Sequence, residues 1–162
     1  MIAFPDSASS LPGSLTDSRS SDAGLEAVRS FAERLAELSP SDWVEVGNSL
    51  LRDASAHATR ATASALLVST INGRGLDVAA WYACDAIETS AFYVSRPSCS
   101  TPSDRRAFAA AHAAAEDAAL ALLAREFLPA SDYEALCDPF ITQAPRNRAD
   151  IRLDCAAPVR SR

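Results

Sequence analysis

The chain has 162 residues, of which 48% are hydrophobic, and it carries a formal net charge of −6 at neutral pH. This length suffices for one domain with a buried core, and the hydrophobic content is too high for a wholly disordered chain. The acidic balance argues against a general nucleic-acid binder, because such a protein needs a basic face for the phosphate backbone.

The charge is distributed unevenly along the sequence. Residues 141–162 contain five arginines and two aspartates, which gives this segment a net charge of +3. The first 22 residues carry −2, so residues 23–140 carry −7. This distribution indicates an acidic domain followed by a basic tail.

The cysteines and the apolar runs indicate the cellular compartment. The four cysteines, at positions 84, 99, 137 and 155, lack the C-x-x-C spacing of a zinc framework and do not form the pattern of a disulfide scaffold. Residues 1–10 lack the basic and apolar regions of a secretory signal, and no run approaches 18 uninterrupted apolar residues. We therefore expect a cytoplasmic protein with reduced thiols and no membrane-spanning segment.

Residues 1–21 are predicted to form a disordered leader, because they contain seven serines and almost no apolar periodicity. From residue 23 to residue 38, apolar residues recur at intervals of three and four, as on one face of an amphipathic helix. These positions are Leu25, Val28, Phe31, Leu35 and Leu38. They predict the first helix and the start of the folded domain, which we place at residues 22–140.

A second helix is predicted over residues 40–71. Ser39 suits the N-cap of this helix, and Pro40 suits its first position, where proline is well tolerated. Such a helix would be longer than its neighbours. We therefore expect a kink near Gly47 or Asp53.

The third helix, predicted over residues 76–95, has apolar residues on both of its sides. One side carries small and aliphatic residues that we expect to be buried: Ala80, Ala83, Cys84, Ile87, Ala91 and Val94. The opposite side carries Trp81 and Phe92 together with Asp85 and Glu88. In a monomeric bundle a helix buries one stripe and exposes the other. Trp81 and Phe92 are therefore predicted to contact a second subunit in a homodimer, with the two acidic residues near the edge of the contact.

The fourth helix, predicted over residues 102–128, is rich in alanine, which has the highest helix propensity and lets a neighbouring helix approach closely. A short fifth helix is predicted over residues 131–137, where Asp138-Pro139 is expected to break it. No segment shows the alternation of a β-strand. The sequence therefore predicts an all-α protein, an antiparallel four-helix bundle with a short fifth helix, followed by a mostly irregular tail over residues 141–162.

Four polar residues form a candidate site. Asp85 and Glu88 are one turn apart on the third helix, and His112 and Glu116 are one turn apart on the fourth. Carboxylates and histidines of facing helices hold metals in ferritin-like bundles, but through Glu-x-x-His pairs that this chain lacks. We interpret the four residues as hydrogen-bonding and ion-pairing groups at a helix interface. A metal-binding or small-ligand-binding bundle is the alternative.

No sequence pattern indicates catalysis or a cofactor. Cys84 lies on the apolar stripe, no serine occurs in a G-x-S-x-G sequence, and no G-x-G-x-x-G or Walker motif is present. The sequence favours a non-enzymatic protein that acts through protein–protein contacts or self-association. Weak contact between nucleic acid and the arginine-bearing tail is a second alternative, although Asp150 and Asp154 within the tail disfavour it.

Overall fold

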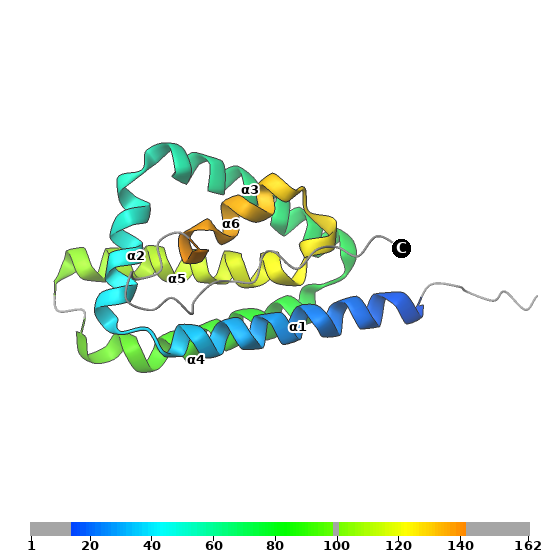
Figure 1. Ribbon diagram of the computed structural model, residues 1–162, viewed down its shortest axis with the longest axis horizontal. Coiled ribbons are helices and arrows are strands. Elements are labelled where there is room, and N and C mark those ends of the chain that lie inside the picture. The colour runs from blue at the N-terminus through cyan, green and yellow to red at the C-terminus, as the bar shows by residue number, and fades with distance from the viewer. Residues whose placement is uncertain (1–13, 99–100, 142–162) are drawn as a thin grey trace, which may run out of the picture.

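The computed structural model describes the backbone of residues 14–98 and 101–141 (Figure 1). Over these ranges the chain forms six α-helices and one short 3-10 turn, and it contains no strand. The predicted all-α class is therefore confirmed. The described part has one long helix more than predicted, because the segment 40–71 forms two helices.

Helix α1 (Ser14–Ala36) begins nine residues before its predicted start. Residues 14–21, which we assigned to the leader, are therefore helical, and residues 1–13 lie outside the described residues. The first turn of this helix contains Asp17, and an acidic residue is favourable near a helix N-terminus. The high serine content of this stretch concealed that signal.

Helix α2 (Pro40–Arg52) begins with a complete capping box. The backbone N–H of Asp42 donates a hydrogen bond of 3.2 Å to the Ser39 hydroxyl oxygen. The Asp42 carboxylate in turn accepts a hydrogen bond of 2.8 Å from the backbone N–H of Ser39. Two donors that a helix start leaves unpaired are thereby satisfied, which fixes where the chain turns after α1.

The expected kink in the segment 40–71 lies at Asp53, where α2 ends and α3 (Ala54–Arg74) begins. Asp53 has an extended backbone, and its carboxylate accepts a hydrogen bond of 2.9 Å from the N–H of Ala56. The same residue thus ends one helix and caps the next. At the far end of α3, Gly75 takes a φ of 66°, the left-handed conformation that favours glycine.

Gly47 does not bend α2 but allows it to cross α5 (Pro102–Leu123) at short range. A Cβ atom placed on Gly47 would lie 1.7 Å from the backbone carbonyl oxygen of Ala107, so no side chain fits there. One turn earlier on α2, the fully buried ring of Trp43 lies 5.4 Å from the ring of Phe108. The crossing therefore combines the smallest residue with one of the largest.

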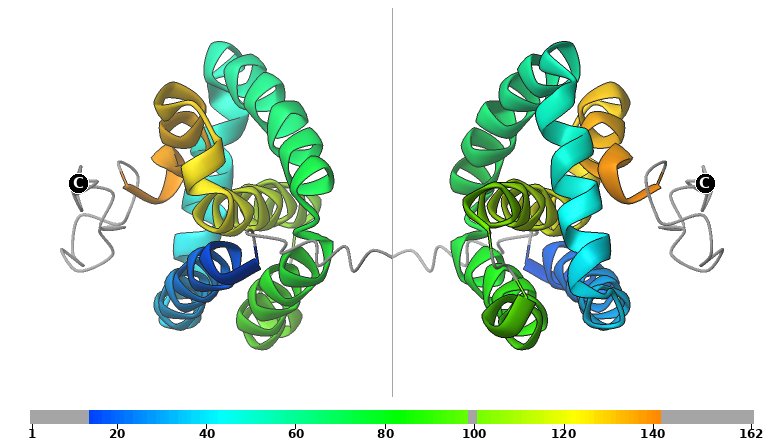
Figure 2. Two further views of the ribbon diagram at one scale, coloured as in Figure 1. Left: turned by 90° about the vertical axis from the view of Figure 1, so that its right-hand side faces the viewer. Right: turned by 90° about the vertical axis from the view of Figure 1, so that its left-hand side faces the viewer.

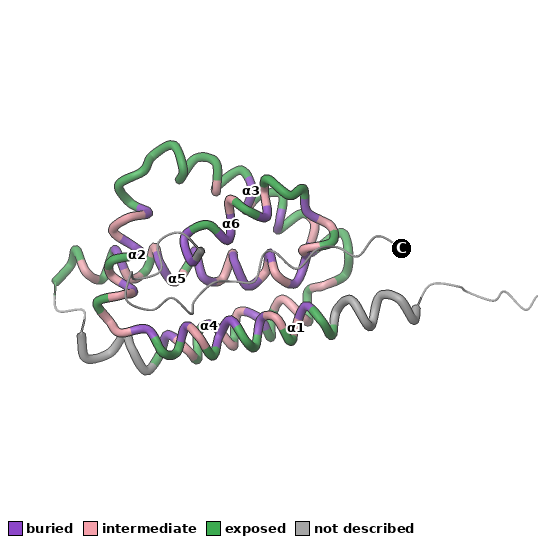
Figure 3. Tube along the Cα trace, viewed as in Figure 1, coloured by how far each residue is buried: buried purple, intermediate pink, exposed green. Residues whose placement is uncertain are grey.

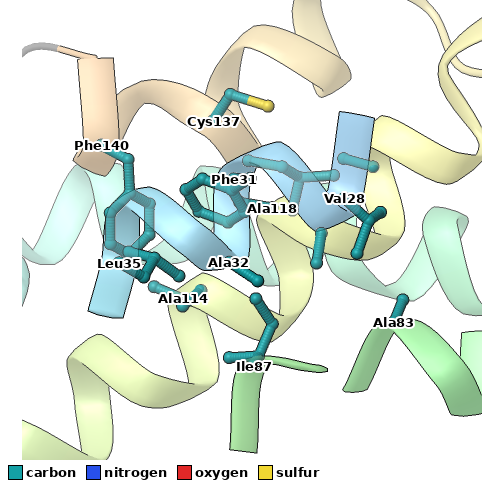
Figure 4. Close-up of a cluster of buried hydrophobic side chains, with 14 of the residues drawn as sticks. Val28, Phe31, Ala32, Leu35, Ala83, Ile87, Ala114, Ala118, Cys137 and Phe140 are labelled. Atoms are coloured by element: carbon teal, nitrogen blue, oxygen red, sulfur yellow. The ribbon is translucent and has the colours of Figure 1, made fainter. Parts of the chain in front are cut away.

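The last helices differ from the prediction at their ends. Helix α4 spans Asp77–Ser98, and α5 is followed by the 3-10 turn η1 (Arg125–Phe127). Helix α6 (Ala130–Ile141) continues through Pro139, so the predicted break at this residue is wrong. Proline in the last turn removes only one hydrogen bond near the helix end, and here its ring is fully buried. Burial of the neighbouring Phe140, whose ring lies edge-on 5.4 Å from that of Phe31, also favours this extension (Figure 4).

The helices pack around α5, which carries a long series of buried alanines. Helices α1 and α4 lie side by side as one layer next to α5, whereas α3 and α6 lie on its other side and α2 crosses it (Figure 2). Helices α4 and α5 run antiparallel (Figure 1), but the more specific prediction of an antiparallel four-helix bundle is not confirmed. In contrast, α1 and α4 run in the same direction, because α2 and α3 together carry the chain back to the end where α1 begins (Figure 1).

Burial follows this arrangement (Figure 3). Helices α1, α4 and α5 each turn a buried stripe toward one another. Helix α3 buries only a narrow stripe consisting of Ala63, Leu67 and Ile71, and residues 54–59 at its start are all exposed.

Candidate functional site

The structure places the four predicted polar residues in different environments. Asp85 and Glu88 are exposed on α4, whereas His112 and Glu116 are half-buried on α5. Glu88 and His112 line one groove of about 330 Å³ between α4 and α5, and the imidazole ring of His112 stacks on Phe108 at 6.3 Å. Asp85 and Glu116 are not among the residues that line this groove.

A metal site would need these groups to converge. Within the part of the chain that the structure describes, no three His, Cys, Asp or Glu side chains are placed to hold a metal ion together. The second histidine, His57, is exposed at the start of α3, two helices away in sequence from His112. The described residues thus offer no support for the metal-binding alternative.

A polar cluster that the sequence did not reveal connects α3 to α5. The Ser64 hydroxyl donates a hydrogen bond of 3.1 Å to the Asp117 carboxylate. Burial raises the pKa of Asp117, while the hydrogen bond from Ser64 and the charge of Arg60 act in the opposite direction. Burial likewise lowers the pKa of Arg60, against the attraction of Asp117 and Asp138. Because the Ser64–Asp117 hydrogen bond joins α3 to α5, we interpret the cluster as a structural connection between the helices, although two buried nitrogens of the Arg60 guanidinium have no hydrogen-bond partner among the described residues.

Cys84 lies near this cluster, and its surroundings disfavour a nucleophilic role. The side chain is half-buried, and burial raises the pKa of its thiol. The negative charges of Glu116 and Asp117 raise this pKa further. A nucleophilic cysteine requires the opposite environment, with cations that stabilise the thiolate.

The most unusual surface of the described domain is the outward side of α4, which we call the outer face. Three aromatic residues are exposed on it, with exposed fractions of 63% for Trp81, 55% for Tyr82 and 48% for Phe92. The full outer face consists of Val78, Trp81, Tyr82, Asp85, Glu88, Thr89 and Phe92, all of which are exposed. The rings of Trp81 and Tyr82 meet edge-to-face, with centroids 5.0 Å apart.

The helical period explains why these residues share one face. Their spacing of three, four and seven residues places them along one side of a 3.6-residue helix. The predicted inward stripe lies on the other side, where Ala83, Ile87 and Ala91 are buried and Ala80 and Cys84 are half-buried. Val94 lies outside the side chains that the structure describes. The prediction that Trp81 and Phe92 lie opposite the buried stripe is therefore confirmed. It omitted Val78 and Tyr82, which the same spacing identifies.

Grooves flank the outer face on both sides. Toward α1 lies a mainly apolar groove of about 610 Å³ between α1 and α4. Its lining on α1 includes the charged residues Arg29 and Glu33 beside Leu25, Val28 and Ala32, and its lining on α4 includes Tyr82. Its floor is fixed by the hydroxyl of Ser90, which lies 2.9 Å from the carbonyl oxygens of both Ala32 and Ala86. Toward α5 lies the smaller groove described above, whose wall includes Phe92. The outer face is thus a ridge between two depressions.

The outer face is acidic as well as aromatic. Residues 77–92 contain Asp77, Asp85 and Glu88 but no arginine. On the neighbouring α1, Arg29 forms an exposed ion pair of 2.7 Å with Glu26. Among the side chains of α4 that the structure describes, the charged ones are therefore all acidic.

Two further observations bear on the class of protein. Among the described residues, no helix combines the length and the hydropathy needed to cross a bilayer. Compared with known protein families, curated proteins and solved structures, the chain shows no match in any of the three. The function is therefore inferred from the chemistry of the protein surface.

Proposed function

We propose that this helical bundle acts through protein–protein contacts and that the outer face of α4 is its contact surface. The observation that carries the proposal is the exposure of Trp81, Tyr82 and Phe92 along one side of a single helix. Aromatic residues dominate the energy of protein interfaces, because they bury a large area and lose little conformational entropy. These three residues are clustered on one ridge, which is typical of an interaction surface. Apolar residues scattered singly over a surface would not indicate one.

A second copy of the chain is the partner that we propose. The outer face of α4 and the apolar groove beside α1 both belong to the layer formed by α1 and α4 (Figure 2). Under two-fold symmetry, each copy can place its ridge against the groove of the other. Trp81 and Tyr82 would then lie in an apolar environment.

The same pairing places like charges near one another. Asp85 and Glu88 stand on the ridge of each copy, and Glu33 lines the groove that receives the ridge, so two-fold packing brings carboxylates of the two chains near one another. Arg29 also lines this groove, but it is already paired with Glu26. Salt screens this repulsion, which has a range of about 10 Å at 0.1 M ionic strength. A dimer formed through the outer face is therefore expected to strengthen as salt is added.

Light scattering at micromolar concentration tests the proposal. We expect the full chain to have the mass of a dimer, and Trp81→Ala to weaken the dimer by about 30-fold, which corresponds to about 2 kcal/mol for a central aromatic contact. Leu51→Ala is the matched control, because Leu51 is an exposed apolar residue on α2. A monomer whose mass is the same in the wild type and in Trp81→Ala would refute the proposal.

A further inference from the structure

The charge of the outer face indicates a second occupant besides another copy. Asp85 and Glu88 lie beside Trp81 and Phe92, so the best-matched partner combines apolar residues with positive charges. A second copy would supply apolar residues, but its outer face carries the same acidic residues. A basic and partly apolar segment offers both.

The chain contains such a segment directly after α6. Residues 142–162 carry five arginines and two aspartates, and they include apolar residues among the arginines, as in Arg148-Ala-Asp-Ile-Arg152-Leu153. Arginine is also the cation that interacts best with an aromatic ring, especially with the ring of tryptophan. The composition of this segment therefore complements both components of the outer face.

The position of α6 makes this face accessible to the segment. Helix α6 ends at Ile141, and the preceding Phe140 packs against Phe31 of α1 (Figure 4). Helix α1 is the direct neighbour of α4, so the segment needs to cross only one helix. Its 21 residues reach roughly 70 Å when extended, about twice the length of the 23-residue α1.

We propose that residues 142–162 bind the outer face of α4 in the same chain. Arg148 and Arg152 contact Asp85 and Glu88, and the apolar residues between them cover Trp81. The segment then competes with a second copy for this surface and limits self-association. This competition rests on the proposed function of the outer face, whereas binding of the segment can be measured without it.

The two occupants respond to salt in opposite directions. Binding of the arginine-bearing segment joins opposite charges, so salt weakens it. Pairing of two outer faces joins like charges, so salt strengthens it. Raising the ionic strength therefore shifts the outer face from the segment to the second copy.

The tryptophan fluorescence of the wild-type chain can report this exchange. Trp43 is fully buried, whereas Trp81 is 63% exposed in the described domain. Quenching of tryptophan fluorescence by acrylamide, a neutral quencher, therefore reports on Trp81. A Trp81→Phe variant gives the background from Trp43. Measured at a concentration where light scattering finds only monomers, the quenching reports binding within one chain.

Two variants that remove the same number of charges test the proposal. Arg148→Gln/Arg152→Gln alters the segment, and Arg105→Gln/Arg106→Gln alters exposed residues at the start of α5. We expect the first variant to increase the quenching of Trp81 at low salt and to strengthen self-association by about two- to tenfold. The α5 variant should do neither. High salt should raise the quenching of the wild type to the level of the first variant.

The outcomes separate this inference from the proposed function. Equal quenching of Trp81 in the wild type and in Arg148→Gln/Arg152→Gln, at low and high salt, overturns the binding of the segment. Quenching that responds as expected while every variant stays monomeric supports that binding and refutes self-association. A dimer whose affinity is the same in all variants refutes the competition.

Discussion

The crossing of α2 over α5 and the outer face of α4 differ in how closely another helix lies against them. At the crossing, Gly47 lies against the backbone of Ala107, and both residues are buried. On the outer face, Trp81 and Phe92 are exposed. At the crossing the two backbones lie so close that no side chain fits at Gly47, whereas the large ring of Trp43 is buried one turn earlier. No described helix covers the outer face, so these two aromatic residues of α4 stay exposed and can contact a partner.

The largest expected effect tests the interior half of this comparison. Gly47→Ala should lower the free energy of unfolding by about 3 kcal/mol or more, because the added methyl group meets backbone atoms and α2 must move away from α5. Gly73→Ala is the matched control, since a Cβ atom at Gly73 meets nothing within 4 Å. This control should gain about 0.5–1 kcal/mol from the higher helix propensity of alanine.

Urea denaturation followed by circular dichroism measures both variants. Equal stability of Gly47→Ala and the wild type would mean that the two helices lie farther apart than described. The lack of a side chain at Gly47 would then have no structural role, and the contrast between the crossing and the outer face would not hold.

The next expected effect compares the two sides of α4 directly. Ile87 is fully buried on the inward side, and Ile87→Ala should cost about 2–4 kcal/mol of stability through lost burial and the cavity left behind. Trp81→Ala removes a larger side chain from the outer face. At high salt, where we expect residues 142–162 to leave the outer face, it should change monomer stability by less than about 0.5 kcal/mol, because the ring is mostly exposed.

Denaturation at a concentration below that of self-association isolates the monomer. A cost of more than about 2 kcal/mol for Trp81→Ala at high salt would show that the ring is buried within the described domain. A cost that is larger at low salt than at high salt would fit binding of residues 142–162 to the outer face.

Much of the fold could be predicted from the sequence, because local signals were strong. Helix starts such as Ser39-Pro40 and the kink at Asp53 depend on neighbouring residues alone. The outward position of Trp81 also followed, since it depends only on the helical period. The continuation of α6 through Pro139 did not, because burial of Pro139 and Phe140 against other helices outweighs the local preference for a break.

The candidate site was predictable only in part, for a related reason. Residues on one helix, such as Trp81 and Phe92, could be assigned to a shared face. The grouping of residues from different helices depends on crossing angles and axial positions that no local pattern contains. The pair Ser64 and Asp117 was therefore missed, while Asp85 and His112 were considered together although they do not line the same groove.

The smallest expected effect concerns the half-buried hydrogen bond between Ser64 and Asp117. Ser64→Ala should cost about 1 kcal/mol at neutral pH, because the partly buried carboxylate loses a donor. The pKa of Asp117 is already raised by burial, and loss of the hydrogen bond raises it further. Ser69→Ala, at an exposed position of α3, is the matched control.

The stability cost of Ser64→Ala is expected to depend on pH in a defined direction. A carboxyl group whose pKa is higher in the folded state binds protons more tightly there, so the folded protein loses stability as pH rises through the interval between the unfolded and folded pKa values. The Ser64 hydroxyl stabilises the charged form and reduces that loss. The cost of Ser64→Ala should therefore be largest above the folded pKa of Asp117 and should shrink as the carboxyl is protonated in acid. Urea titrations of wild type, Ser64→Ala and Ser69→Ala between neutral and acidic pH measure this stability cost. A cost that does not change with pH would mean that Asp117 is not the group to which Ser64 is coupled.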